Sequence, residues 1–433
     1  MKRPKVLMLG WEFPPIVNGG LGVACLGLSR ALARKTELTM ILPKADPNFI
    51  VENVDLIGLN NVDVDKLKKV RTSKKYKEFA SVYTIDSDIL PYDTAPNYDI
   101  LNTFKKEKPE QEVEFDLSRM NRFGMGDIYG DDLINKVIDY AKYVAQLSSK
   151  IEFDVIHCHD WMTMLAGVEV KKLTKKPLIL HIHSLEYDRC GPQSQGWIYQ
   201  LEKYGMQQAD VVVPVSFYTG EIIKSHYKIK EDKIIPVHNG ADPVAVNKEE
   251  KPFPDKLVLY LGRITGQKGP QYFLDIATKV AENYPEVRFV MAGTGDRLKG
   301  LIETGAYKKI GNKLHFTGFL SKEKVRHLLS IGDVYVMPSV SEPFGISALE
   351  AAQFGVPCVI SHQSGVSEVL HGALKADYWD SELMASHIIS LLKDNKLKEK
   401  VINEAYQDLK HCTWDKAADK VLDVYERAFA TTI

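Results

Sequence analysis

Short apolar runs alternate with helix-type patterns along both halves of the chain, and this alternation constrains the fold more than any other feature. The runs cover residues 6–9, 38–42, 154–157, 178–182 and 211–214 in the first half, and residues 257–261, 288–292, 314–317, 334–337 and 357–360 in the second. Their length and continuous apolar character are typical of strands buried on both faces. Helical patterns, such as residues 21–34, separate most of them. Repeated βα units predict an α/β protein with doubly wound parallel sheets.

The chain has 433 residues, which is too many for one ordinary core, so we expect two domains. Residues 241–255 are rich in proline and charge and form the expected boundary. We therefore predict a Rossmann-like N-terminal domain over residues 1–245 and a second over residues 246–410. In residues 411–433, Thr413 is suited to cap a helix whose apolar face would pack back on the first domain.

Residues 50–130 break the rhythm, because they are irregular, charged and aromatic. Their length predicts a functional or lid-like insertion. The acid pairs Asp63/Asp65 and Asp86/Asp88 are expected to be surface acids, although some sugar-nucleotide enzymes hold a metal with such a pair. A basic run over residues 66–77 is expected to be a solvated face, and contact with an anionic membrane surface or an acidic acceptor is the alternative.

Charge and cysteine content exclude several classes of protein. The formal net charge is -1, so no global field favours nucleic acid or a membrane. The five cysteines are scattered without metal-type spacing, as expected for reduced thiols in a cytoplasmic protein. The apolar run near the N-terminus is too short for a signal sequence or a membrane span, and no later run is long enough to cross a bilayer.

The stretch from Ser341 to Glu350 carries the strongest chemical signal. Glu342 follows the apolar run 334–337, and Glu350 falls about one turn into the next helical pattern. The free N–H groups at the start of that helix, near Gly345, Ile346 and Ser347, can receive an anion. Two acids beside an anion site suit a ligand that is both sugar-like and phosphorylated. The alternative is that Glu342 only stabilises the helix dipole and that Glu350 is solvated.

Two other loops follow strands in the same way. Arg263 comes directly after the run 257–261, and Lys268 comes five residues later before a helix, so the two cations could neutralise a diphosphate. A solvated charged loop is the alternative. The glycines at Gly19 and Gly20 would let a ligand approach the backbone, although a double glycine is often a simple turn.

Two histidine pairs, His157/His159 and His181/His183, occupy alternate positions of predicted strands. Alternate residues face the same side of a strand, so each pair could point at a ligand together. A metal site is one interpretation. A histidine that contacts substrate is favoured, because no further ligand cluster has zinc-type spacing.

In order and spacing, these motifs resemble retaining glycosyltransferases of the GT-B fold, within them the glycogen and starch synthase-like group and its glycosyltransferase family 4 relatives. The resemblance covers nearly the whole chain. It rests on Pro14-Pro15-x3-Gly19-Gly20-Leu21-Gly22, His157-x-His159-Asp160-Trp161, His238-Asn239-Gly240-Ala241-Asp242, Gly262-Arg263-x4-Lys268-Gly269, Ala292-Gly293-x-Gly295, Glu342-Pro-Phe-Gly-x3-Leu-Glu350 and Trp414-Asp415.

The resemblance implies two Rossmann-like domains that face each other across a cleft, with the last helix returning to the first domain. It implies that Arg263 and Lys268 hold the donor diphosphate, that Glu342 contacts hydroxyls of the donor sugar and that His183 lies near that sugar. Asp160 would lie on the acceptor side. The donor-binding residues it implies are Gly19, Gly20, Asn239, Gly262, Gly293, Phe344, Gly345, Ile346, Ser347 and Glu350, the last of them at the ribose. No metal ligand and no cofactor are expected.

The expected activity is retaining transfer of a hexose, glucose from ADP- or UDP-glucose, to a glucan or oligosaccharide. A lipid or lipopolysaccharide acceptor, a GT-B-fold sugar-nucleotide epimerase and a non-catalytic nucleotide-sugar sensor are the alternatives. The chain departs from the family pattern at two places. Val17-Asn18 stands where enzymes that use ADP-glucose typically carry Lys-Thr, and Ser364 stands where a glycine is usual. The first departure leaves UDP-glucose or another donor open.

Overall fold

The computed structural model describes residues 3–16, 19–61, 123, 128–130, 132–246 and 249–430. Asp63/Asp65, Asp86/Asp88, the basic run 66–77 and Val17-Asn18 lie outside these residues. The chain divides into two compact units. Unit 1 comprises residues 1–215, 220–237 and 417–433, and unit 2 comprises residues 216–219 and 238–416.

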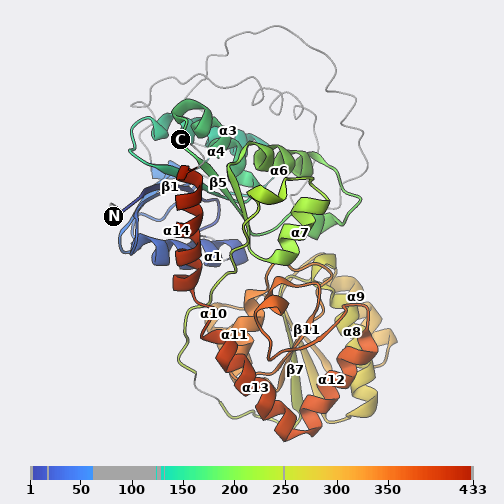
Figure 1. The fold of residues 1–433 in the computed structure, drawn as a ribbon. Coiled ribbons are helices and arrows are strands. Elements are labelled where there is room, and N and C mark those ends of the chain that lie inside the picture. The colour runs from blue at the N-terminus through green and yellow to red at the C-terminus, as the bar shows by residue number, and fades with distance from the viewer. Residues whose placement is uncertain are drawn as a thin grey trace. The chain divides into compact units, whose positions relative to one another are not determined.

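Within the described residues, each unit contains one six-stranded sheet in which every pairing is parallel (Figure 1). The first sheet has the strand order β3-β2-β1-β4-β5-β6, and the second has the order β12-β11-β10-β7-β8-β9. Numbered from the first strand of each unit, both orders are 3-2-1-4-5-6. This is the doubly wound topology, in which ligands bind where the strand order reverses, between strands 1 and 4. The prediction of two doubly wound parallel sheets is confirmed.

The strands of unit 1 are nearly continuous apolar runs because helices cover both faces of the sheet. Helices α3, α4 and α6 pack together on one face, and α1 lies against β2 and β3. The strands are β1 (Lys5–Leu9), β2 (Glu37–Leu42), β3 (Val54–Gly58), β4 (Val155–His159), β5 (Leu178–Ile182) and β6 (Val211–Pro214). The helices are α1 (Gly20–Ala33), α3 (Leu133–Ser148), α4 (Trp161–Thr174), α5 (Glu186–Cys190), α6 (Trp197–Gln208) and α7 (Phe217–Ser225).

In unit 2, α8 and α12 pack against one face of the sheet and α11 and α13 lie on the other (Figure 1). A core that includes Phe273, Phe289 and Ile388 fills the first of these layers. The strands are β7 (Lys256–Leu261), β8 (Val287–Ala292), β9 (Leu314–Gly318), β10 (Val334–Met337), β11 (Cys358–Ser361) and β12 (Leu374–Ala376). The helices are α8 (Pro270–Asn283), α9 (Leu298–Tyr307), α10 (Lys322–Ile331), α11 (Ile346–Gln353), α12 (Ser381–Lys393) and α13 (Asn395–Leu409).

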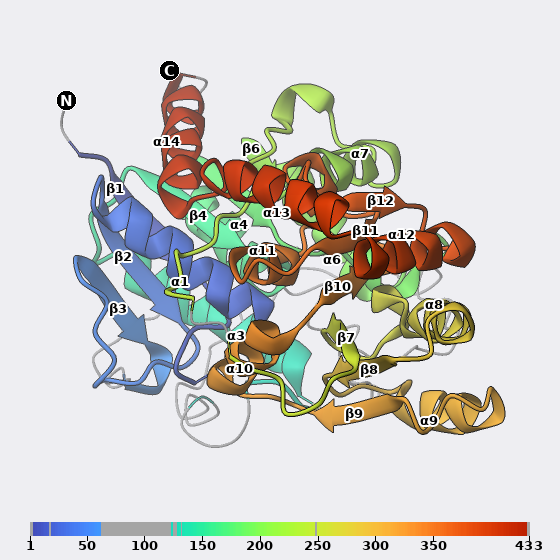
Figure 2. The same cartoon turned by 90° about the horizontal axis from the view of Figure 1, so that it is seen from below.

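The last helix, α14 (Trp414–Ala430), begins as the sequence predicts, because the Thr413 hydroxyl accepts a hydrogen bond from the N–H of Lys416 (3.3 Å). From residue 417 onwards the helix belongs to unit 1. Its Tyr425 hydroxyl lies 2.6 Å from His157 Nδ1 on β4, and Asp419 forms an ion pair with Lys35. Figure 2 shows the helix beside β1 and β4. The C-terminal residues thus complete a layer of the first sheet.

None of the helices built from described residues combines the length and the apolar character that crossing a bilayer requires.

Candidate functional site

The predicted phosphate and sugar contacts of unit 2 lie at the carboxyl ends of β7 and β10, the pair of strands at which the order of the second sheet reverses. Arg263 follows β7, and Glu342 lies on the loop after β10. Burial raises the pKa of the Tyr260 hydroxyl above its usual value, the Glu342 carboxylate raises it further, and the Arg263 guanidinium opposes the shift. The two charges therefore share one end of the sheet.

Lys268 and Glu342 form an ion pair within this group. Glu342 is only 6% exposed, and Lys268 is half-buried. Lys268 ends the 3₁₀ turn over residues 266–268, which is held against the loop after β10 by two hydrogen bonds. Val340 N–H donates to the Gln267 carbonyl (2.9 Å), and the Gln267 amide donates to the Ser341 carbonyl (3.1 Å). These bonds fix Lys268 and Glu342 side by side. The lysine can bind a phosphate, and the glutamate can accept a hydrogen bond from a hydroxyl.

The loop after β10 is also held by the loop after β11. Glu342 N–H donates to the Gln363 carbonyl and Gly365 N–H donates to the Glu342 carbonyl, both at 2.9 Å. A Cβ atom on Gly365 would lie 2.2 Å from the Pro343 carbonyl oxygen, so only glycine fits there. Ser364, the departure from the family pattern, is buried, and its hydroxyl donates to the Ser361 carbonyl at 2.7 Å. The serine is accommodated without loss of the loop geometry.

The backbones of Gly262 and Gly293 are in close contact, and Gly262 directly precedes Arg263 in the sequence. A Cβ atom on Gly293 would lie 1.9 Å from the Gly262 carbonyl oxygen, and both residues have φ values that favour glycine, +153° for Gly262 and +146° for Gly293. Gly262 N–H donates to the Ala292 carbonyl (3.0 Å). These glycines bring the ends of β7 and β8 together and leave backbone, rather than side chain, at the site.

Helix α11 begins beside Glu342, as predicted. Gly345 precedes it at φ +104°, and Ser347 is held by the Tyr335 hydroxyl (2.8 Å). Phe344 is buried, which fixes the peptide that leads into the helix. The first N–H groups of a helix lack internal partners and attract anions. Glu350, one turn further, is partly buried, and its carboxylate has no ion-pair or hydrogen-bond partner among the described residues. Burial raises its pKa, against the opposing effects of Lys322 and Arg326.

Asn239 is buried within a segment that packs on the start of α14. Ala241 N–H donates to the Cys412 carbonyl (3.0 Å). The neighbouring His238 lies 2.6 Å from the Glu368 carboxylate, which also accepts from the N–H groups of Phe217 (2.9 Å) and Tyr218 (2.7 Å). Glu368 was not predicted as a functional residue, although it lies four residues after Ser364, one of the two departures from the family pattern.

In unit 1, the two predicted histidine pairs form one array on a single face of the sheet. His157 and His159 on β4 stack with ring centroids 4.7 Å apart, and His181 and His183 on and after β5 stack at 4.6 Å. Hydrogen bonds join the pairs across the strands, from His157 Nε2 to His181 Nδ1 (3.2 Å) and from His159 Nδ1 to His183 Nε2 (2.8 Å). The strand that carries His157 extends to His159, two residues beyond the predicted run.

All four imidazoles are neutral at physiological pH. Burial lowers the pKa of His183 to about 3, and burial together with the neighbouring rings lowers the pKa of His157, His159 and His181 well below the usual range. His183 Nδ1 has no hydrogen-bond partner among the described residues. A neutral imidazole with one open nitrogen can exchange a hydrogen bond with a hydroxyl group.

Asp160 follows β4 at the end of the first sheet where β1 and β4 are neighbours. It has φ +59°, and its Oδ1 accepts from the N–H groups of His183 (2.6 Å) and Ser184 (3.3 Å). Burial raises its pKa to about 7, although these bonds and Arg189 oppose the shift. The carboxylate therefore holds the His183 loop in place, whatever else it contacts.

Glu12, after β1, is a buried acid that sequence reasoning missed. It accepts a hydrogen bond from the Tyr129 hydroxyl, and its Oε2 has no partner among the described residues. A Cβ atom on Gly19 would lie 2.4 Å from that oxygen, whereas a Cβ atom on Gly20 would meet nothing within 4 Å. Gly19 precedes α1 and Gly20 begins it. An acid that directly follows the first strand of a doubly wound sheet was the available signal.

The predicted residues thus form two groups. Unit 2 brings together Arg263, Lys268, Glu342, Gly262, Gly293 and the α11 N-terminus, and unit 1 brings together His183, Asp160 and the Gly19–Gly20 loop.

Comparisons with known proteins agree with this architecture. Residues 5–235 match the family described as "Starch synthase catalytic domain", and residues 243–408 match "Glycosyl transferases group 1". An uncharacterised glycosyltransferase of Methanocaldococcus jannaschii is 27% identical over 98% of both chains, and a glycogen synthase of Mycobacterium tuberculosis is 23% identical over 97% of this chain and 94% of its own. The catalytic domain of starch synthase IV from Arabidopsis thaliana, bound to ADP and acarbose, has a similar fold, with a TM-score of 0.68 at 16% identity over 99% of this chain and 100% of its own.

Two doubly wound parallel sheets with these matches define a glycosyltransferase of the GT-B class. Because the starch synthase match spans more than half of the 433 residues, the chain belongs to the starch synthase catalytic domain family and is a glycosyltransferase of the glycogen and starch synthase type.

Proposed function

We propose that this protein transfers glucose from a nucleoside diphosphate sugar, ADP- or UDP-glucose, to a glucan or oligosaccharide with retention of anomeric configuration. The observation that carries the proposal is the ion pair between the half-buried Lys268 and the buried Glu342, at the point where the order of the second sheet reverses. A cation beside a carboxylate at this place, next to the start of α11, suits a ligand with phosphate at one end and hydroxyls at the other.

Donor binding rearranges this pair in the proposed mechanism. The diphosphate competes with Glu342 for the Lys268 ammonium and takes a second contact from Arg263. Glu342, released from Lys268, accepts hydrogen bonds from hydroxyls of the sugar. The α11 N–H groups lie along the phosphate, and the partly buried carboxylate of Glu350 accepts from the ribose. Gly262 and Gly293 supply a side-chain-free backbone beside the ligand.

The proposed role of unit 1 is to contact the sugar and the acceptor. His183 offers a neutral ring whose Nδ1 is open to a sugar hydroxyl. Asp160 holds the His183 backbone. As the resemblance to GT-B enzymes implies, Asp160 would stand on the acceptor side and Gly19 and Gly20 would contact the donor.

The difficult step is departure of the nucleoside diphosphate from the anomeric carbon. Arg263, Lys268 and the α11 N–H groups would stabilise the charge that develops on the leaving phosphate, so that no metal ion is required. One preorganised group of this kind contributes about 3 kcal/mol to lowering the barrier. The acceptor hydroxyl then attacks from the face that the phosphate leaves, and the leaving phosphate accepts its proton.

Transfer is tested with ADP-glucose, UDP-glucose and GDP-mannose in turn, each with a malto-oligosaccharide and with or without EDTA. We expect one glucose nucleotide to be selected, an α-linked product by proton NMR, and a rate that EDTA does not lower. Lys268→Ala should reduce the rate about a hundredfold. The matched control is Lys308→Ala, which removes a surface ion pair with Asp275 (3.0 Å) in the same unit.

Full activity of both Lys268→Ala and Glu342→Ala would overturn the site assignment. If a chemically altered donor formed without any acceptor, the protein would be a sugar-nucleotide epimerase and not a transferase.

A further inference from the structure

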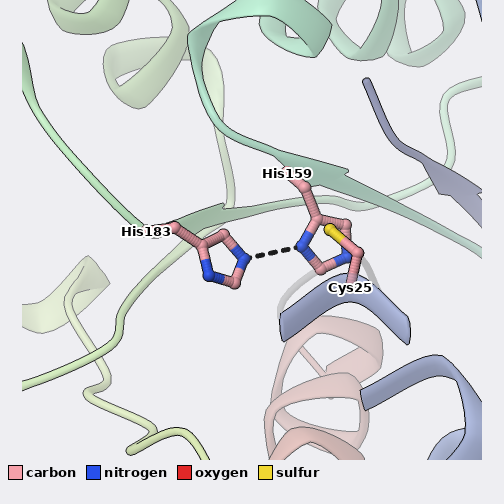
Figure 3. Close-up of side chains that lie close together, drawn as sticks. All are labelled: Cys25, His159 and His183. Atoms are coloured by element: carbon pink, nitrogen blue, oxygen red, sulfur yellow. Dashed lines mark hydrogen bonds between the residues drawn. The ribbon is translucent and has the colours of Figure 1, made fainter. Parts of the chain in front are cut away.

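Unit 1 brings a thiol to the histidine array from a part of the chain that the sequence does not connect to it. Cys25 lies on α1 and is fully buried. Its sulfur and one ring nitrogen each from His159 and His183 all lie within 4.8 Å of one another. Figure 3 shows the Cys25 side chain beside His159, with the ring of His183 pointing toward His159 from the next strand. Three separate segments therefore converge on one point.

The hydrogen bonding of the two imidazoles is incomplete. His159 Nδ1 and His183 Nε2 share one proton at 2.8 Å. Whichever ring donates it, the outer nitrogens, His159 Nε2 and His183 Nδ1, are left as one N–H group and one lone pair, and neither has a partner among the described residues. Buried polar groups of this kind are rare in folded proteins and call for a ligand.

The surroundings favour a cation. Burial raises the pKa of the Cys25 thiol, and the carboxylates of Asp160 and Glu12, both of them buried, raise it further. Glu12 Oε2 is itself unpartnered among the residues that the structure describes. Two buried acids next to neutral imidazoles and a thiol offer negative charge and soft ligands. Arg189, the cation that acts on Asp160, is already paired with Glu186 and Glu202.

We propose that Cys25, His159 and His183 bind a zinc-class ion, and that the ion inhibits glycosyl transfer by taking His183 away from the donor sugar. Cysteine sulfur with imidazole nitrogen is a typical zinc ligand set, whereas Mg²⁺ and Ca²⁺ select oxygen. Ligand atoms of a tetrahedral zinc site lie about 3.3–3.7 Å apart, given bond lengths of about 2.0–2.3 Å. The two ring nitrogens that share a proton, 2.8 Å apart, would therefore separate slightly, and the sulfur would approach them by up to about 1 Å. The ion replaces the thiol proton, which is released to solvent. The proton that the rings share moves to the outer nitrogen of the ring that carries it, so both imidazoles bind as neutral ligands.

The alternative grouping of His157, His159 and His181 is less suited to an ion. His157 already uses one nitrogen on Tyr425 and the other on His181, so either atom that it could offer to a metal is already hydrogen-bonded. That group also contains no sulfur. Metal binding by Cys25, His159 and His183 would break only the hydrogen bond between the two rings and would add a charged ligand, the Cys25 thiolate.

Binding is measured directly and without substrate, so it is independent of the proposed function. Competition with a chromophoric chelator should show one tight Zn²⁺ site per chain that Mg²⁺ does not occupy. Cys25→Ser and His159→Gln should each weaken Zn²⁺ binding about 100-fold or more. Co²⁺ should give a thiolate-to-metal charge-transfer band that is lost in Cys25→Ser. The control is Cys190→Ser, which removes an exposed thiol of the same unit and should change neither result.

The inhibitory part rests on the proposed function and is measured separately. Zn²⁺ should inhibit the wild-type enzyme at the concentration at which it binds, and Cys25→Ser should resist that inhibition when each protein is compared with its own rate without zinc. Far-ultraviolet circular dichroism checks that the variants are folded. Equal Zn²⁺ affinity of the wild type and Cys25→Ser, or a Co²⁺ spectrum without a thiolate band, would overturn the site. Binding at Cys25 without inhibition would overturn the regulatory role alone.

Discussion

Lys268 and Glu342 neutralise each other in the absence of a ligand, and this single contact connects the stability of the site with its function. A carboxylate so deeply buried is stabilised by its partner, and removing one member leaves the other charge uncompensated. The pair also keeps both groups in the positions that a phosphorylated sugar would use.

Glu342→Gln and Lys268→Ala should therefore differ in which part of the ligand they affect. Lys268→Ala should weaken binding of the free nucleoside diphosphate, because its contact is with phosphate. Glu342→Gln should leave diphosphate binding largely intact and weaken binding of the whole nucleotide sugar by about tenfold, the effect of one charge-assisted hydrogen bond. Isothermal titration with UDP, ADP and the corresponding glucose nucleotides distinguishes the two. Equal losses for diphosphate and nucleotide sugar in both variants would contradict these roles.

Asp333, far from the proposed chemistry, is expected to set the acid stability of unit 2. It accepts from Leu257 N–H (2.9 Å) and pairs with Lys251 and Lys256 (3.4 Å). These contacts lower its pKa although burial opposes the shift. Since the folded pKa lies below the unfolded one, the stabilisation is present above the unfolded value of about 3.9 and is lost as the pH falls through the folded value.

Asp333→Asn should consequently destabilise unit 2 at pH 7 by about 1–3 kcal/mol. The difference from the wild type should shrink below about pH 4, where the wild-type carboxylate also becomes protonated. Urea unfolding at a series of pH values measures this difference in the free energy of unfolding. The control is Asp275→Asn, which removes a surface ion pair of the same unit, and a difference that stays constant down to pH 3 would count against the assignment.

At the scale of elements, the loops that leave the strands depend on glycines for different reasons. Gly293 has φ +146° and touches the Gly262 backbone, whereas Gly300 lies in exposed helix α9 with open space around its Cβ position. Gly293→Ala should destabilise unit 2 by more than about 1 kcal/mol and weaken diphosphate binding, since the loop beside Arg263 must shift. Gly300→Ala should instead stabilise the unit by about 0.4–1 kcal/mol. Denaturant unfolding and calorimetric binding distinguish the two, and a neutral Gly293→Ala would contradict the packing.

Helix α14 is expected to stabilise unit 1 through one buried polar contact in addition to its apolar face. Tyr425→Phe removes the hydroxyl that meets His157 Nδ1 and leaves that nitrogen without a partner. We expect a loss of about 1–3 kcal/mol in the free energy of unfolding. Tyr406→Phe, on the partly exposed face of α13, is the matched control and should change little. Equal stability of the two variants in urea would show that the hydrogen bond contributes nothing net.

At the scale of the whole molecule, each unit has its own sheet and its own core, so ligands should protect them unequally. In hydrogen exchange followed by mass spectrometry, UDP or ADP should slow exchange mainly in residues 262–269 and 342–347 of unit 2, where the N–H groups of the site lie. Lys268→Ala should abolish this protection. Protection confined to unit 1 would place the diphosphate elsewhere and refute the proposed donor site.

The periodicity of the sequence predicted ten strands, and each corresponds to a strand of the structure within a residue or two at its ends. Buried parallel strands are easily recognised, because both faces must be apolar. Strands β3 and β12 were missed, because β3 lies within the irregular stretch 50–130 and β12 has only three residues. The helix after Glu342 and the cap at Thr413 were found, because turn glycines and cap residues act through local geometry.

The sequence by itself determined the α/β architecture, the family and the residue types available to hold a phosphorylated sugar, because periodicity and motif spacing are local properties of the chain. Only the tertiary structure decided which of those residues meet. Lys268 reaches Glu342, Tyr425 reaches His157, and Cys25 joins His159 and His183, across separations that no local pattern encodes. The first contact follows from the strand order, since parallel strands distant in sequence end at the same edge of a sheet and bring the residues of their loops together. The other two arise because helices α14 and α1 pack against the first sheet.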